Sequence, residues 1–135
     1  MRSEFSLNTA LITGASRGIG RSAARVFSQA GWNLLLLARN QESLSSLANE
    51  LRNDGTTVFF KEVDLSDPKS IKPGIKDLLG HGLTPSVLIN NAGVAWTGDL
   101  LSMSLDSWQW LFQMNLTSVF QICAAVVPNM REKGG

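Results

Sequence analysis

Hydrophobic residues follow two alternating patterns along this chain. Short aliphatic runs at residues 9–13, 33–38, 57–63 and 86–90 predict four β-strands. Between these runs, residues 18–30, 41–54 and 68–79 carry apolar side chains at helical spacing. Because the strands are apolar at nearly every position, they suit a parallel sheet that helices cover on both faces. The pattern therefore predicts a doubly wound α/β fold in a single domain, residues 1–135.

The helical segments carry further signals at their ends. The third helix is expected to begin at Pro68, with Ser66 or Asp67 as its N-cap. The last segment, residues 105–131, is apolar on almost every side of a helix. We expect such a helix to be covered by more than one neighbour, one of them a second copy of the chain in a homo-oligomer. Pro128 is expected to kink or end it.

Composition narrows the classes of partner. Twelve Lys and Arg against eleven Asp and Glu give a formal charge of +1, which argues against a nucleic-acid partner. The N-terminal residues contain no apolar leader, and the longest aliphatic run, residues 34–38, is far too short to cross a bilayer. We therefore expect a soluble, cytoplasmic protein with no membrane partner. The single cysteine, Cys123, and the isolated His81 predict neither a disulfide framework nor a metal site.

A glycine-rich segment, residues 13–20, lies between the first strand and the first helix. It reads Thr-Gly-Ala-Ser-Arg-Gly-Ile-Gly, with glycines at 14, 18 and 20. Glycine allows the tight turn after the strand, a close approach of the backbone to an anion, and close packing of helix against strand. A helix N-terminus also attracts negative charge. The segment therefore predicts a site for the pyrophosphate of a dinucleotide.

Three further motifs follow in order: Asp64 within Val-Asp-Leu, the run Asn-Asn-Ala-Gly at residues 90–93, and Asn115. Together with residues 13–20 they make the chain resemble the short-chain dehydrogenase/reductase family over its whole length. The resemblance implies a Rossmann-type sheet with strand order 3-2-1-4. It also implies that the chain is the N-terminal, cofactor-binding portion of a longer reductase, truncated after the fourth strand and its following helix.

The resemblance also assigns site residues. It implies that the glycine segment surrounds the pyrophosphate and ribose, with Ile19 on the nicotinamide side, and that Asp64 accepts a hydrogen bond from the adenine amino group. Asn90 is expected to be mainly structural. The residues expected to bind the cofactor are Gly14, Ser16, Arg17, Gly18, Ile19, Gly20, Arg39, Asp64, Asn91, Ala92 and Gly93.

The end of the second strand distinguishes between the two nicotinamide cofactors. A site for NAD places a carboxylate there to accept from the ribose 2′-hydroxyl, whereas a 2′-phosphate needs cationic donors. Ala38 occupies the acidic position, Arg39 follows it, and Arg17 lies in the glycine segment. This arrangement favours NADP (NADPH) over NAD. The alternative is that both arginines are ordinary surface residues.

The resemblance implies hydride transfer between the cofactor and a small-molecule carbonyl or alcohol substrate. The family's acid/base tyrosine, with its serine and lysine partners, lies on a fifth strand and a following helix, and this chain contains no tyrosine. Asn115 alone matches the catalytic set, where the family uses it to shape the active-site helix and hold a water. We therefore expect an NADP-dependent oxidoreductase fragment that cannot turn over alone. The alternative is a non-catalytic NADP-binding or oligomerisation module.

Overall fold

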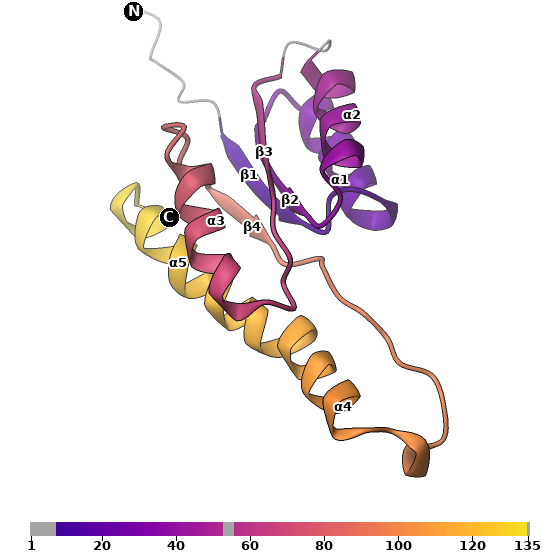
Figure 1. The fold of residues 1–135 in the computed structure, drawn as a ribbon. Coiled ribbons are helices and arrows are strands. Elements are labelled where there is room, and N and C mark those ends of the chain that lie inside the picture. The colour runs from indigo at the N-terminus through magenta and orange to yellow at the C-terminus, as the bar shows by residue number, and fades with distance from the viewer. Residues whose placement is uncertain (1–7, 53–55, 135) are drawn as a thin grey trace, which may run out of the picture.

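A four-stranded parallel sheet forms the centre of the protein (Figure 1). The computed structural model describes residues 8–52 and 56–134. The strands lie in the order β3-β2-β1-β4, and Ile12 pairs with Leu36 on one side and with Ile89 on the other. The strand order and the doubly wound α/β class are thereby confirmed. The strand bounds are β1 (Thr9–Thr13), β2 (Asn33–Ala38), β3 (Val58–Glu62) and β4 (Val87–Ile89).

Helices cover both faces of the sheet, because successive residues of a strand point to opposite sides. On one face, Ile12 and Leu36 pack with Leu44 of the second helix. On the other face, Leu11 and Leu35 pack with helices from the second half of the chain. The first face carries α1 (Gly18–Gln29) and α2 (Gln41–Arg52), and the second carries α3 (Pro68–Leu79) and α5 (Ser118–Glu132).

Element ends differ little from expectation. β3 and β4 are each one residue shorter at both ends than predicted, and α1 ends one residue earlier. The predicted end of the second helix, Asp54, lies outside the described residues. Of the two candidate caps for α3, the structure selects Asp67, whose side chain accepts from the backbone N–H of Lys69 at 3.0 Å. Pro68 follows as the first residue of the helix, where its missing N–H costs nothing.

The predicted helix 105–131 is not uniform. It begins as α4 (Leu105–Phe112), widens into a π-helical turn, η2 (Gln113–Thr117), and continues as α5; a short 3₁₀ turn, η1 (Leu100–Ser102), precedes it. The expectation that Pro128 ends the helix is wrong, because α5 continues to Glu132. Pro128 has no N–H, so the carbonyl of Ala124, four residues earlier, loses its helical hydrogen-bond partner. Both residues are exposed, so water can bond to that carbonyl instead.

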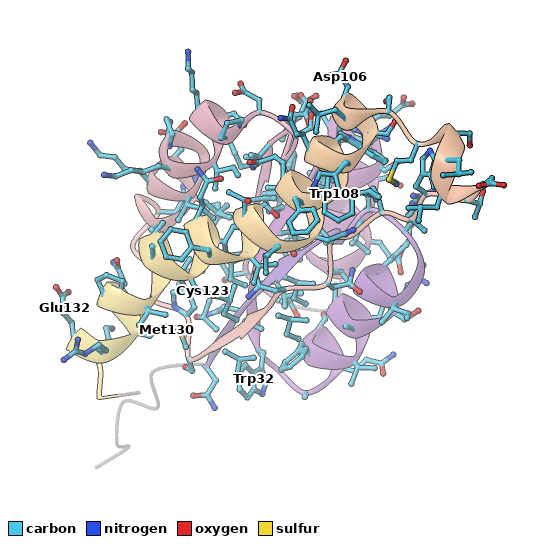
Figure 2. The ribbon with its side chains drawn as sticks, turned by 90° about the horizontal axis from the view of Figure 1, so that it is seen from below. Trp32, Asp106, Trp108, Cys123, Met130 and Glu132 are labelled. Atoms are coloured by element: carbon cyan, nitrogen blue, oxygen red, sulfur yellow. The ribbon has the colours of Figure 1, made fainter. Side chains whose placement is uncertain are left out.

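Much of this helical run is exposed in the single chain. Figure 1 shows α4 and the loop before it extending beyond the end of the sheet. In α5 only Ser118, Ile122 and Val126 are buried, and within α4 no residue is. Trp108, labelled in Figure 2, packs its ring 4.7 Å from that of Phe112 but stays 48% exposed. Coverage from more than one side is therefore not found within the part of the chain that the structure describes.

Residues Leu105–Glu132 also have the length and hydropathy of a membrane-crossing helix. The core helices of soluble proteins pass the same test. Ile122 and Val126 are fully buried against the sheet, which gives these two apolar residues of α5 a role in the fold.

Candidate functional site

A cavity of about 430 Å³ opens where the carboxyl ends of all four strands meet. Ligands of open α/β sheets bind at this edge. The residues that line the cavity follow β1, β2, β3 and β4 and include one from the π-helical turn. They are Gly14, Ser16, Arg17, Gly18, Ile19, Ala38, Arg39, Asn40, Ser43, Val63, Asp64, Leu65, Asn91, Ala92, Gly93, Val94 and Met114.

The glycine segment makes a tight turn from β1 into α1. Gly14 and Gly18 both have positive φ, at 65° and 56°, which favours glycine. A Cβ on Gly20 would collide with the carbonyl oxygen of Gly14. No side chain caps the first turn of α1, in contrast to the cap on α3. The first amides of α1 therefore remain available to an anion in the cavity.

A hydrogen-bonded junction joins this turn to the end of β4. The hydroxyl of Thr13 accepts from the backbone N–H groups of Asn91 and Ala92, at 3.1 and 3.0 Å. In return, the Asn91 side-chain amide donates to the carbonyls of Thr13 and Gly14, at 3.1 and 3.2 Å. The two walls of the cavity are thus held together by polar contacts, with Thr13 itself 1% exposed.

Asp64 lies at the end of β3 with its carboxylate in a local turn. Its Oδ1 accepts from the hydroxyl and the backbone N–H of Ser66, at 2.7 and 2.9 Å. The Ser66 hydroxyl, then the Ser66 N–H, and to a smaller extent the positive charge of Arg39 hold the pKa of Asp64 below its ordinary value. Asp64 is therefore ionised at neutral pH and acts as an acceptor at the wall of the cavity.

The end of β2 lies between the glycine turn and the end of β3. The carbonyl of Leu37 accepts from the N–H of Ala15 at 3.3 Å, and that of Ala38 accepts from Val63 at 2.9 Å. Ala38 is buried, whereas Arg17 and Arg39 are exposed residues that line the cavity. Both arginines therefore border the same cavity, and the position before Arg39 carries no carboxylate.

Asn115 does not line the cavity, although the adjacent Met114 and its hydrogen-bond partner Val94 do. Its amide accepts from the backbone N–H of Val94 at 2.9 Å and donates to the Val94 carbonyl at 2.8 Å. Asn115 lies at the centre of the π-helical turn, between Met114, which lines the cavity, and Leu116. The contact therefore fixes the loop after β4 to the helix at the cavity wall.

Two glutamines anchor the same helix to the loop after β3. Gln113 donates to the carbonyl of Leu65 at 3.0 Å and to the side chain of Gln121 at 3.1 Å. Gln121 in turn donates to the carbonyl of Pro68 at 3.1 Å. Leu65 and Met114 both line the cavity, so these contacts connect two parts of its wall.

Comparison with known proteins identifies the family. A family model described as short chain dehydrogenase matches residues 8–135. The chain belongs to the short-chain dehydrogenase family. Members of the family are oxidoreductases, and the cavity lies at the carboxyl ends of the strands, where ligands of open α/β sheets bind.

Similar members of the short-chain dehydrogenase family include two bacterial enzymes. The chain is 33% identical over 129 residues to the 3-oxoacyl-(acyl-carrier-protein) reductase FabG of Chlamydia trachomatis, covering 94% of this chain and 52% of that protein. It is 38% identical over 122 residues to the oxidoreductase UcpA of Escherichia coli K12, covering 90% of this chain and 46% of UcpA. The chain thus spans about half the length of the curated relatives it matches.

Solved structures of the family show the same fold. L-sorbose reductase from Gluconobacter frateurii, in complex with NADPH and L-sorbose, superposes with a TM-score of 0.91 at 27% identity, covering 96% of this chain and 50% of that one. The alcohol dehydrogenase of Thermococcus sibiricus, in complex with 5-hydroxy-NADP, superposes with a TM-score of 0.90 at 32% identity, covering 96% of this chain and 55% of that one. Nicotinamide cofactors bind these neighbours of the same fold.

The cavity brings together all the expected cofactor-binding residues except Gly20, which packs beneath it against Gly14. It also contains residues that the sequence analysis did not select. Val63, Leu65, Val94 and Met114 adjoin selected residues and had no signal of their own, whereas the polar pair Asn40 and Ser43 lies just after Arg39. Among the described residues, no group of three His, Cys, Asp or Glu side chains could hold a metal ion.

Proposed function

We propose that this chain is the NADP-binding part of an oxidoreductase that transfers hydride between NADP(H) and a carbonyl or alcohol substrate. The observation that carries the proposal is the end of β2, where Arg39 and Arg17 border the cavity and Ala38 stands where an NAD site places a carboxylate. Guanidinium groups bind phosphate through paired, charge-assisted hydrogen bonds. Relatives of known structure in complex with NADPH and NADP forms support the same cofactor.

The cavity residues fit a dinucleotide from end to end. The uncapped start of α1 suits the pyrophosphate, and the close packing of Gly20 beneath Gly14 leaves that space to the ligand. The ionised carboxylate of Asp64 suits the adenine amino group, and Ile19 lies on the nicotinamide side. Ser16, Asn91, Ala92 and Gly93 complete the site around the riboses and nicotinamide. When bound, the cofactor supplies or accepts the hydride.

We propose that catalysis uses a residue type that this chain does not contain. Resemblance to the family assigns proton transfer to a tyrosine with serine and lysine partners, and the sequence contains no tyrosine. We propose that turnover belongs to a protein of the relatives' length and that these 135 residues bind cofactor without turnover. Asn115 acts as a positioning residue, because its amide holds the loop at Val94 against the π-helical turn.

The exposed apolar surface of α4 and α5 supports a homo-oligomer formed through residues 105–131. Leu116 and Phe120 are 60% and 72% exposed, and a second copy would remove them from water. The same surface favours the alternative function, a non-catalytic NADP-binding or oligomerisation module. In either case we place the protein in the cytoplasm, with neither nucleic acid nor membrane as partner.

A cofactor titration tests the proposal. Calorimetry, with tryptophan fluorescence in parallel, would measure the Kd of the purified chain for NADPH and for NADH. We expect tighter binding of NADPH, lost in Arg39→Asp and kept in Lys72→Asp, a matched charge change on α3. Equal affinity for the two cofactors would overturn the NADP assignment, and binding of neither would overturn the proposed cofactor site.

A further inference from the structure

We propose that Gln113 is a positioning residue that couples the two ends of the proposed cofactor cavity. Adenosine bound at Asp64 tightens, through Gln113, the contact between Asn115 and Val94 at the other end. The inference rests on the proposed cofactor site, because it takes the adenine to lie at Asp64. Gln113 itself does not line the cavity and begins the π-helical turn η2.

The π-helical turn contacts the segments that follow the two outermost strands. Gln113 donates to the carbonyl of Leu65, after β3, at 3.0 Å, whereas Asn115 exchanges two hydrogen bonds with the backbone of Val94, after β4. Because β2 and β1 lie between them, β3 and β4 are separated by about 14 Å at the usual spacing of strands. Side chains two positions apart on a helix point to different sides, so one turn reaches both segments.

The orientation of the Gln113 amide is fixed by the chemistry of its partners. Its Nε2 donates to the carbonyl of Leu65 and, at 3.1 Å, to Oε1 of Gln121. The Nε2 of Gln121 donates in turn to the carbonyl of Pro68 at 3.1 Å. Backbone carbonyls only accept, so each amide nitrogen must face its carbonyl, and the oxygen of Gln121 is left to face Gln113. The two glutamines therefore hold the loop after β3 at both Leu65 and Pro68.

This loop also holds the carboxylate that we assign to the adenine. Ser66 lies between the two anchored carbonyls and donates to Asp64 through its hydroxyl and its backbone N–H. Leu65 is buried, so leaving its carbonyl without the Gln113 donor would be costly. A ligand that bonds to Asp64 restrains the loop, and through the Leu65 carbonyl it restrains Gln113 and the turn that begins there.

At the other end of the cavity, the same turn holds Val94. The Asn115 amide accepts from the Val94 N–H and donates to the Val94 carbonyl, so a firmer turn gives a firmer loop after β4. π-Helical turns are rare and occur mostly at functional sites. Coupling between two contacts is reciprocal. Loss of the Asn115 contact must therefore weaken binding at Asp64 by the factor with which binding tightens that contact.

Hydrogen exchange in the wild-type chain tests this coupling without any substitution. AMP contains the adenosine that NAD and NADP share and lacks the nicotinamide half. By NMR, saturating AMP should slow exchange of the Val94 amide about fivefold or more. Binding of AMP with no change in the exchange rate of Val94 would overturn the proposal.

The variant Gln113→Met keeps the bulk of the side chain and removes its donors. In this variant AMP should leave the exchange rate of the Val94 amide unchanged. Gln109→Met, on the exposed surface of α4, is the matched control and should respond to AMP as wild type does. A wild-type response in Gln113→Met would show that the coupling does not pass through Gln113.

Calorimetric titration with AMP measures the coupling in the reverse direction. Asn115→Ala alters the far end of the cavity, yet it should raise the Kd for AMP about fivefold or more. In a Gln113→Met background the same substitution should leave that Kd unchanged. If Gln113 only supported the fold, the effects of the two substitutions would add, and additivity would contradict the proposal.

The outcomes separate this inference from the function on which it rests. If the chain binds AMP and prefers NADPH while the Val94 amide does not respond to AMP, the cofactor proposal stands and the coupling role of Gln113 fails. If AMP does not bind, the assignment of the adenine to Asp64 fails, and the coupling fails with it.

Discussion

Thr13 and Asn91, 78 residues apart in the sequence, hold the ends of β1 and β4 together by hydrogen bonds in both directions. The Thr13 hydroxyl accepts from the Asn91 backbone N–H, and the Asn91 side chain donates to the Thr13 carbonyl. The hydroxyl also donates to the carbonyl of Ile89, at 3.5 Å. The glycine turn and the loop after β4 are therefore joined by one buried hydroxyl together with the side-chain amide of Asn91.

Thr13→Val should be markedly destabilising although it preserves shape. The substitution leaves the N–H groups of Asn91 and Ala92 without their acceptor, which should lower the free energy of unfolding by about 2–3 kcal/mol. Urea denaturation measures the loss. Thr13→Ser is the control, because it keeps the hydroxyl and removes one methyl, at a cost of about 1 kcal/mol. Equal stability of the two variants would show that the hydroxyl contributes nothing.

Two glycines of the same turn should respond differently to alanine. At Gly20 the new Cβ would collide with the Gly14 carbonyl oxygen, a backbone atom that cannot move without opening the turn, so we expect a loss of about 3 kcal/mol or more. At Gly18 nothing lies within 4 Å, and only the positive φ of 56° opposes a side chain, at about 1–2 kcal/mol. Circular dichroism during urea unfolding would rank them, and the reverse order would contradict this account.

The fold was largely predictable from the chain because its core strands are so uniform. The four consecutive leucines of β2 are all fully buried, since a central parallel strand has helices on both faces, and that burial explains an apolar run without alternation. Parts of the cavity wall were predictable where the backbone needs glycine, as at Gly14 and Gly18, which both have positive φ. Gly20, expected among the residues around the cofactor, packs under the cavity against Gly14 rather than lining it.

Other features depend on contacts between distant segments and left no local signal. The π-helical turn at Asn115 accompanies a bond to Val94, 21 residues away, which no helical periodicity encodes. The glutamine contacts to Leu65 and Pro68 are likewise tertiary. Pro128 was expected to kink or end the helix. However, the Ala124 carbonyl that it leaves without a partner is exposed to water, and α5 continues to Glu132. Ser43 was overlooked because serines are common on exposed helix faces.

Stability should depend on acid through Glu50 of α2, which joins α1 and α2. Its carboxylate accepts from Arg25 at 2.6 Å and from Arg21 at 3.3 Å, and the Arg25 hydrogen bond is the main cause that lowers the pKa of Glu50. A carboxyl with a lowered pKa stabilises the fold above its unfolded pKa, about 4.3, and loses that contribution as the pH falls through the folded pKa.

Glu50→Gln should therefore be less stable than wild type at pH 7, and the difference should shrink as the pH falls below the unfolded pKa of about 4.3 and through the lower folded pKa. Because the pair is exposed, the difference at pH 7 should be small and should shrink in about 1 M salt. Thermal unfolding across this pH range measures it, with Glu62→Gln on β3 as the matched control. A difference in stability between Glu50→Gln and wild type that does not change with pH would show that the charge of Glu50 is not its cause.

Asn115 should affect cofactor binding without discriminating between cofactors. Asn115→Ala removes both hydrogen bonds to the Val94 backbone, and Asn115→Asp keeps the acceptor but directs a carboxylate oxygen at the Val94 carbonyl. Since Val94 and Met114 line the cavity, either change should weaken the binding of NADPH and of NADH by similar factors. Aspartate should be the more damaging, because its carboxylate is repelled by the Val94 carbonyl oxygen. Gln109→Ala, an exposed change on α4, should have no effect. Asn115→Asp binding both cofactors like wild type would show that the contact with Val94 does not shape the cavity.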